Sequence, residues 1–174
     1  MKLADFHIGL EFLGSAGFRW RCTDVGTRTI AAIRLDRDDS NWYQGPPYIA
    51  EEVVFDEHEI ERCDLSETDA ITSAIREHET SGHPGYPAEA VRRMMKALSA
   101  HRYPDEGVLR FDRRRADGEI LHPYAGKKEG ETWMVELYLP FQNIYEKMLE
   151  SDFIALPRAS SDDVRARAVR AGRV

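Results

Sequence analysis

The sequence has only two cysteines among its 174 residues, and no apolar run in it approaches the roughly 18 residues of a membrane-spanning helix. Cys22 and Cys63 are too few for a disulfide framework or a four-cysteine zinc site. Each lies in a strand-like segment, where a reduced and buried thiol is expected. The first residues also lack the apolar core of a secretory signal. We therefore expect a protein without membrane contact that stays in the cytoplasm.

The common catalytic signatures are missing as well. The sequence has no phosphate-binding loop, no dinucleotide fingerprint, no nucleophile elbow and no complete set of metal ligands. A common enzyme of this length normally carries at least one of these signatures. We therefore expect a non-enzymatic module that needs no cofactor and binds a protein partner, and a homo-oligomer stays an open alternative.

The charges of the chain are unevenly distributed. Its 24 lysines and arginines face 31 acidic residues, which gives a formal net charge of −7 and argues against nonspecific coating of nucleic acid. The segment Glu51–Glu79 holds eleven carboxylates and two arginines, whereas the tail from Arg158 holds five arginines and two aspartates. The acidic segment is expected to meet a basic partner or the tail of a second copy, and a tail that does not dock is expected to be mobile.

Short strands separated by turns of small residues fill the first 65 residues. Alternating apolar residues predict strands over 6–13, 18–23 and 29–35, and less regular ones over 51–56 and 60–65. Open edges of such a meander would promote aggregation. We therefore predict a small SH3-like, barrel-like antiparallel meander as a subdomain over residues 1–65.

The composition changes at Ser66–Asp69, where a capping-box pattern predicts the start of a helix. A second helix is predicted over 88–101, with Val91, Met94, Met95 and Leu98 as its buried stripe. Strands over 108–112, 119–124 and 133–139 then form a three-stranded antiparallel meander, followed by terminal helices over 141–149 and from 160 onward. The prediction is an α+β fold with subdomains 1–65 and 66–174, or both as one structural unit.

Part of the chain resembles a known group of proteins. The stretches that carry the resemblance are Gly9–Phe12, Arg19–Arg28, Gly45–Tyr48 and Val53–Glu57. Over about its first 65 residues the sequence resembles a group of uncharacterised bacterial proteins. The resemblance implies a bacterial origin and names no catalytic residue.

The long loop over 36–48 carries the first candidate site. Trp42, Tyr43 and Tyr48 surround Gly45–Pro47, and aromatic faces stack on proline rings, bases or cations. We predict that these three residues bind a ligand or partner, although the same aromatics could instead pin the loop to its own core.

Two alternative functions rest on charged residues. A metal-dependent hydrolase or nuclease would use Asp56, His58 and Glu59 with His78 or His83, because carboxylates and imidazoles bind metal ions that activate water. The same residues also fit an acidic turn and the charged end of a helix, and the hydrolase is therefore the alternative and not the leading hypothesis.

Nucleic-acid binding would instead use Arg113, Arg114 and Arg115, which precede the hairpin turn at Asp117–Gly118. Three adjacent arginines on a hairpin could contact phosphates. The same arginines also fit a charged hairpin that discourages strand pairing, so nucleic acid is possible as a partner but not favoured.

Overall fold

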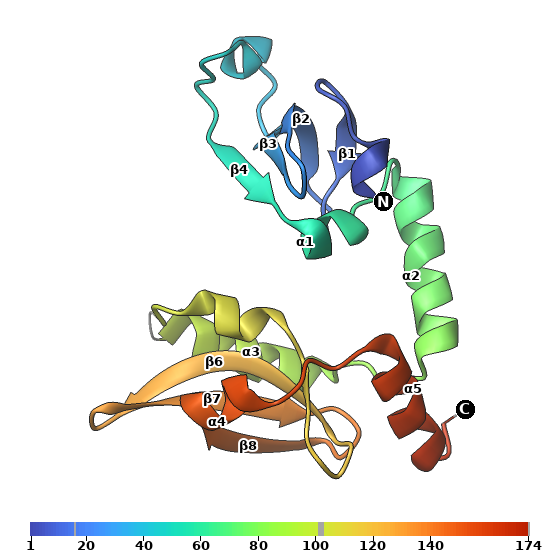
Figure 1. Cartoon of the computed structure of the whole chain (residues 1–174), viewed down its shortest axis with the longest axis vertical. Helices are drawn as coiled ribbons and strands as arrows, with labels where there is room; N and C mark the ends of the chain where they lie inside the picture. The colour runs from blue at the N-terminus through green and yellow to red at the C-terminus, as the bar shows by residue number, and fades with distance from the viewer. Residues whose placement is uncertain (16, 101–102, 174) are drawn as a thin grey trace. The chain divides into compact units, whose positions relative to one another are not determined.

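The computed structural model describes residues 1–15, 17–100 and 103–173, apart from the side chain of His78. The described residues form helices and two antiparallel four-stranded sheets, which confirms the α+β prediction. The chain divides into two compact units, Met1–Arg76 and Glu77–Val174, which are described in turn (Figure 1). Among the described residues no helix is long and apolar enough to cross a membrane.

The first unit contains one sheet whose strands follow one another in chain order. They are β1 (Glu11–Leu13), β2 (Arg19–Val25), β3 (Ile30–Arg34) and β4 (Glu52–Phe55), joined in the order β1-β2-β3-β4. Each neighbouring pair is antiparallel, as expected for strands linked by short turns. The barrel-like closure of this sheet stays a prediction.

The core of the first unit lies on one face of this sheet. Phe12, Cys22, Ile30 and Phe55 pack there with Phe6, which follows the short 3-10 helix η1 (Leu3–Asp5). The rings of Phe6 and Phe55 each meet the ring of Phe12 edge to face, at centroid distances of 5.1 and 5.4 Å. This geometry adds to the stabilisation from burial of the three rings.

The acidic segment after β4 forms a helix, α1 (Glu57–Glu61), where the sequence suggested a break and then a strand over 60–65. Asp56 accepts hydrogen bonds from the backbone N–H groups of His58 and Glu59, at 3.0 and 3.1 Å, and the Glu59 carboxylate accepts from the Asp56 N–H. This capping box satisfies the first donors of the helix. The helix places Ile60 in the core, and burial of Ile60 outweighs the weak strand pattern.

The second sheet has four strands in the described part of the chain, where three were expected. They are β5 (Arg113–Arg114), β6 (Ile120–Glu129), β7 (Thr132–Leu139) and β8 (Ile144–Leu149), again in chain order. Two sequence predictions were wrong here. The predicted strand over 108–112 is mostly the 3-10 helix η3 (Glu106–Arg110), and the predicted helix over 141–149 is mostly β8.

The tertiary context explains the change at β8. Asn143 adopts a left-handed φ of 56° and turns the chain back, so that β8 pairs with β7 along its whole length. The ring of Tyr145 then lies 5.2 Å from the ring of Tyr138 on the neighbouring strand. Cross-strand pairing and ring contact therefore overrule the helical tendency of this segment.

The second sheet is covered on both faces. Successive residues of β7 point to opposite sides, so Val135, Leu137 and Leu139 pack with Phe153 of α4 (Glu150–Ala155). Tyr138 points to the other side and packs with Ala90 and Met94 of α3 (Ala88–Ala100). This double cover explains why the sequence of β7 is almost continuously apolar.

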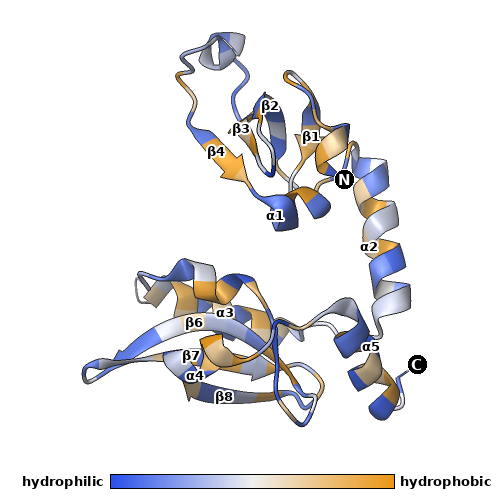
Figure 2. Ribbon diagram, viewed as in Figure 1, coloured by the Kyte–Doolittle hydropathy of each residue, from blue (hydrophilic) through white to orange (hydrophobic). Residues whose placement is uncertain are grey.

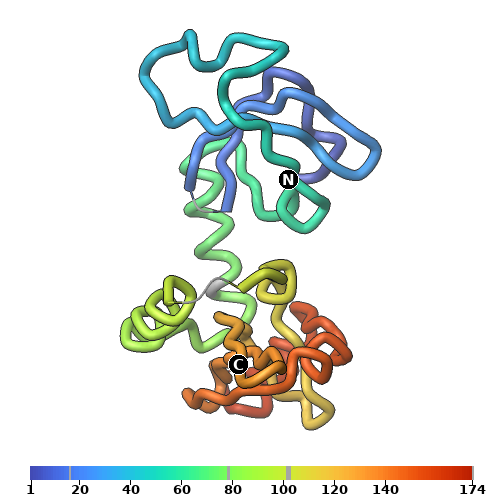
Figure 3. The backbone as a smooth tube through the Cα atoms, turned by 90° about the vertical axis from the view of Figure 1, so that its left-hand side faces the viewer, coloured from blue at the N-terminus to red at the C-terminus, as the bar shows by residue number. Residues whose placement is uncertain are grey.

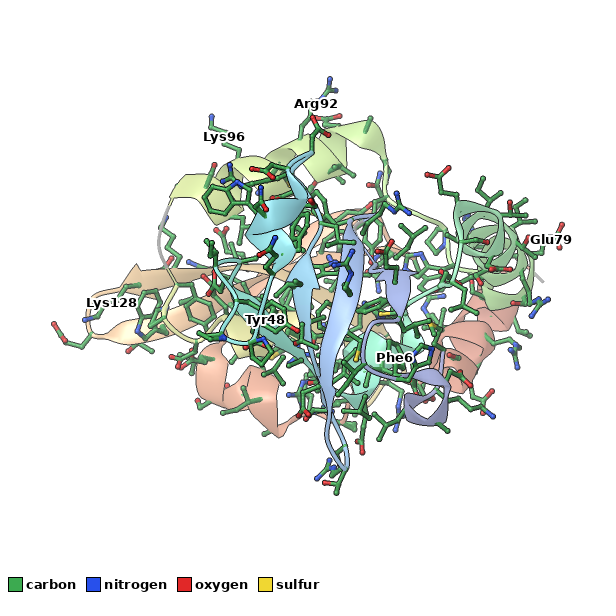
Figure 4. All side chains as sticks on the ribbon, turned by 90° about the horizontal axis from the view of Figure 1, so that it is seen from above. Phe6, Tyr48, Glu79, Arg92, Lys96 and Lys128 are labelled. Atoms are coloured by element: carbon green, nitrogen blue, oxygen red, sulfur yellow. The ribbon has the colours of Figure 1, made fainter. Side chains whose placement is uncertain are left out.

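The outer surface of α3 corrects another prediction. Met94 packs against the sheet as expected, but Met95 is 63% exposed, and Val91 and Leu98 are exposed with it. Arg92 and Lys96 project from the same helix (Figure 4). The predicted stripe was wrongly placed around the helix, because the small Ala90 and Ala97 share the buried side with Met94.

Two further helices begin where the sequence predicts. The Ser66 Oγ accepts from the Asp69 N–H at 3.2 Å just before α2 (Glu67–Ser81). The Ser160 Oγ accepts from the Asp163 N–H, also at 3.2 Å, at the start of α5 (Ser161–Arg170). Hydroxyl caps of this kind satisfy backbone donors that the first turn leaves open.

The basic tail contacts its own unit, while its docking on a second copy stays a prediction. Arg170 donates two hydrogen bonds of 2.8 Å, to the carbonyl oxygens of Asp117 and Gly118. These bonds join α5 to the turn between β5 and β6. The sequence could not anticipate them because they connect residues more than 50 positions apart.

Gly118→Ala is expected to lower the free energy of unfolding of the second unit by about 2–3 kcal/mol. Gly118 has a φ of +78°, and an added Cβ would overlap the guanidinium group of Arg170. Gly130 is the matched control, with a φ of +61° and open space around it. Gly130→Ala should cost only the left-handed strain of about 1 kcal/mol, and equal costs in urea denaturation would contradict the role of Arg170.

Candidate functional site

The loop between β3 and β4 is held by its own hydrogen bonds. This long loop extends away from the sheet and then returns to it (Figure 3), and it contains the 3-10 helix η2 (Ser40–Tyr43). The Asp39 carboxylate accepts from the Asn41 N–H at 2.9 Å and caps η2. The Tyr43 hydroxyl accepts from the Arg37 N–H and donates to the Arg37 carbonyl oxygen at 2.9 Å. These bonds set the orientation of two aromatic side chains, Trp42 and Tyr43.

A pocket of about 390 Å³ lies between this loop and the sheet. We call it the aromatic pocket. Its lining combines three aromatic, three aliphatic and four charged side chains: Trp20, Trp42, Tyr43, Ile49, Ala50, Val53, Arg34, Asp36, Arg37 and Glu51. Its volume is in the range of small-ligand and side-chain binding sites.

Trp20 forms the rigid part of the aromatic pocket. Its ring meets the buried Phe55 ring edge to face at a centroid distance of 4.9 Å. On another side it approaches Gly14 so closely that a Cβ there would lie 2.9 Å from its indole nitrogen. A side chain held in this way loses little conformational freedom when a ligand binds, which favours affinity.

The charges of the aromatic pocket are balanced, and three of the four charged side chains already have partners. Arg34 binds Asp36 at 2.6 Å, and its hydrogen bond to the carboxylate holds the pKa of Asp36 below the usual value. The guanidinium of Arg37 lies 4.3 Å from the centroid of the Trp42 ring. Two basic and two acidic residues line the pocket, so its interior favours a neutral apolar or aromatic group.

Tyr48, the third predicted aromatic residue, is not among the pocket residues. Its ring lies so close to Gly45 that an added Cβ would overlap it, so Tyr48 packs on its own loop. The structure therefore groups Trp42 and Tyr43 in one pocket, and the binding role of Tyr48 stays a prediction. Trp20 and Val53 were not predicted as site residues, because they join the site only through strand pairing.

The predicted metal ligands belong to two different units of the chain. Asp56 and Glu59 form the capping box of α1, while His83 belongs to the second unit, in the connection between α2 and α3. The side chain of His78 lies outside the described residues. Among the side chains that are described, no group of three His, Cys, Asp or Glu residues could hold a metal ion. The hydrolase alternative stays a prediction.

The three predicted nucleic-acid-binding arginines all have partners within the second unit. Arg113 donates to the carbonyl oxygens of Ile154 and Leu156. Arg114 binds Asp163 at 3.0 Å.

Arg115 binds Asp117 and Glu146 at 3.0 and 3.1 Å. A phosphate group would have to compete with these carboxylates and carbonyl groups. Nucleic-acid binding stays a prediction that these contacts do not favour.

The structure also brings together polar residues that the sequence analysis did not combine. The Nδ1 atom of His122 on β6 lies 2.8 Å from an Asp112 carboxylate oxygen and 3.1 Å from the Tyr86 hydroxyl. A carboxylate that is hydrogen-bonded to an imidazole holds the ring in one orientation. No sequence spacing signals this cluster, because α3, η3 and β5 separate its members along the chain.

His83 lies beside this cluster, with its ring 5.2 Å from the Tyr86 ring. Its Nδ1 atom accepts a hydrogen bond from the Gly85 N–H at 3.0 Å, which places the proton of the neutral ring on Nε2. That Nε2 atom is buried and has no hydrogen-bond partner among the described residues. Burial is the main cause that lowers the pKa of His83 below its usual value, and the charge of Asp112 opposes this effect.

Acidification should therefore weaken the second unit through His83. Above about pH 6.5 the ring is neutral in both the folded and the unfolded chain, and its contribution to stability is fully present. As the pH falls below that value, the unfolded chain binds a proton before the folded one does, and stability is lost. Urea denaturation at about pH 7.5 and about pH 5.5 should show a smaller loss for His83→Gln than for the wild type. An equal loss would contradict this assignment.

No model of a protein family, no curated protein and no solved structure matches this chain in the comparisons made with it. Its function is therefore inferred from the geometry of its candidate sites.

Proposed function

We propose that this chain is a non-enzymatic protein-binding or accessory module, and that its aromatic pocket holds an apolar or aromatic side chain of a partner protein. The observation that carries the proposal is the pocket itself. It has a volume of about 390 Å³, and a rigid Trp20 lines it together with the loop residues Trp42 and Tyr43. Trp42 remains 37% exposed, so a ligand can still cover it. Tryptophan and tyrosine in such settings commonly contribute most of the binding energy of an interface.

The two cysteines support a binding role in a reducing compartment. Cys22 and Cys63 are both free and buried. Burial raises the pKa of Cys63 to about 11, and it also raises the pKa of Cys22, so both thiols stay protonated at neutral pH. A protonated, buried thiol is a poor nucleophile. A cytoplasmic location and kinship with the bacterial group named above are parts of the same proposal.

Selection from a phage-displayed peptide library tests the pocket while its natural partner is still unidentified. We expect the wild-type chain to enrich peptides that share an apolar or aromatic residue, and Trp42→Ala to abolish their enrichment. Trp42→Phe is the matched control, because it keeps an aromatic ring against Arg37. Enrichment of the same peptides by the wild type and Trp42→Ala would overturn the proposed function.

Affinities of the enriched peptides can be followed by intrinsic fluorescence. Two of the three tryptophans of the chain, Trp20 and Trp42, line the aromatic pocket. Binding should change their emission, and Trp42→Ala should weaken binding by about 2 kcal/mol, or roughly 30-fold. A loss within about twofold would show that the peptides bind elsewhere.

A further inference from the structure

β4 is an edge strand of the first sheet. It follows β3 at the end of the strand order and carries two exposed apolar residues, Val53 and Val54, which are 38% and 62% exposed (Figures 1 and 2). An edge strand presents unpaired backbone N–H and C=O groups that can bind another strand. Among the described residues of the first unit, β3 is the strand to which β4 is paired.

The alternation of backbone bonds shows which groups of β4 face outward. Leu35 donates to the carbonyl oxygen of Arg19, so the opposed pair Arg19 and Leu35 is a hydrogen-bonded one. Successive residues of a strand direct their backbone groups alternately to one neighbouring strand and to the other. The backbone groups of Leu35 and Ile33 therefore face β2, and those of Ala32 face β4, where the register partner of Ala32 is Val53. The N–H and C=O groups of the next residue, Val54, therefore point away from β3.

The other edge of the same sheet is better covered. On β1, Leu13 exchanges two backbone hydrogen bonds with Asp64, of 2.8 and 3.0 Å, which occupy its outward side. β4 instead borders the aromatic pocket, since Val53 lines the pocket and belongs to the strand. A strand added to β4 would bring alternate side chains toward Trp42 and Tyr43.

The charge around β4 indicates the kind of strand that fits. Residues 38–61, which comprise part of the loop, β4 and α1, contain eight carboxylates and no lysine or arginine. The first unit as a whole has 15 acidic and 8 basic residues, whereas the second has 16 of each, so the net charge of −7 resides in the first. Such a field attracts a cationic segment and repels a second copy of itself.

We propose that the partner supplies an extended segment rich in lysine or arginine, which pairs with β4 as a fifth strand and places an apolar side chain in the aromatic pocket. This inference rests on the proposed function and names the partner's chemistry. Backbone hydrogen bonds to Val54 supply affinity, the pocket selects one side chain, and the surrounding carboxylates select the charge. Glu51, which lines the pocket and precedes β4, is the carboxylate best placed for this selection.

The first test uses two synthetic peptides, one alternating lysine with valine and one alternating glutamate with valine. The lysine peptide should bind the full chain, change the tryptophan emission and shift the amide resonances of Glu52 and Val54. The glutamate peptide should bind at least about tenfold more weakly. Added salt should lower the affinity of the lysine peptide, because it screens the charges. Equal binding of both peptides would overturn the charge selection.

The second test removes the outward donor of β4. Val54→Pro should weaken the lysine peptide about tenfold, because proline has no N–H and is tolerated on a sheet edge. Val54→Thr keeps the N–H and the branched shape and should bind as the wild type does. Both variants must keep the wild-type circular dichroism. If Val54→Pro does not fold, hydrogen exchange of the Val54 amide in the wild type decides, because an added strand must protect it.

A third variant separates charge from pairing. Glu51→Lys should lower the affinity for the lysine peptide about fivefold, which is the effect expected from one exposed charge pair.

The outcomes for the two proposals can be distinguished. If Trp42→Ala abolishes peptide binding but Val54→Pro leaves it unchanged, strand pairing is overturned while the proposed function stands. Failure of the library selection to distinguish Trp42→Ala would overturn the proposed function itself. A dimer of the wild type that Val54→Pro dissociates would show that a second copy is the occupant and overturn the inference.

Discussion

Replacement of Arg167 by alanine is expected to lower the free energy of unfolding of the second unit by about 3–5 kcal/mol. Arg167 of α5 binds the Glu119 carboxylate at 2.9 Å, and the Glu119 side chain is only 4% exposed. Gln142 donates to the same oxygen at 2.7 Å, while the other Glu119 oxygen is buried without a hydrogen-bond partner among the described residues. Loss of the guanidinium would therefore leave a buried negative charge without its counter-charge.

Arg165→Ala is the matched control for this prediction. Arg165 lies on the same helix and pairs with the exposed Asp162 at 3.3 Å, so its loss should cost less than about 0.5 kcal/mol. Urea denaturation of both variants makes the comparison. The double variant Arg167→Ala with Glu119→Gln should recover part of the loss, since it removes the buried charge. Equal stability of Arg167→Ala and Arg165→Ala would contradict the prediction.

Phe12→Ala is expected to lower the free energy of unfolding of the first unit by about 3–5 kcal/mol and to leave the second unit folded. Phe12 is 2% exposed and its ring contacts the rings of both Phe6 and Phe55. The core cluster that contains it consists of residues of the first unit, and the two other clusters belong to the second. A domain of this size has a small free energy of unfolding, so the cavity left by the Phe12 ring should remove a large part of it.

Amide resonances distinguish the two units in this experiment. In Phe12→Ala, the amide signals of the first sheet should move to the chemical shifts of an unfolded chain as urea is added. At the same urea concentrations the β6 and β7 signals should keep their native chemical shifts. Ile8→Ala is the control, because Ile8 is an exposed apolar residue of the same unit and should cost little. Simultaneous loss of both sets of signals would show that the units unfold together.

Sequence reasoning succeeded for the elements that local interactions determine. Ser66 and Ser160 predicted helix starts because a hydroxyl cap reaches only three residues along the chain. It failed where a distant strand decides the conformation, as for β8, whose pairing with β7 overrules its helical tendency. At the candidate site, Trp42 and Tyr43 were found because they are neighbours on one loop. Trp20 and Val53 were missed because strand register brings them there.

The sequence by itself determined the α+β class, the acidic stretch around residue 51 and the aromatic loop, since composition and turn residues express these directly. Only the tertiary structure decided that Trp42 and Tyr43 join Trp20 in one pocket while Tyr48 does not. It also decided that the adjacent arginines 113–115 bind groups of their own unit. The contacts of Trp20 with the loop, and those of the three arginines with Ile154, Asp163 and Glu146, join residues far apart in the chain. No local pattern encodes which distant partner a side chain will meet.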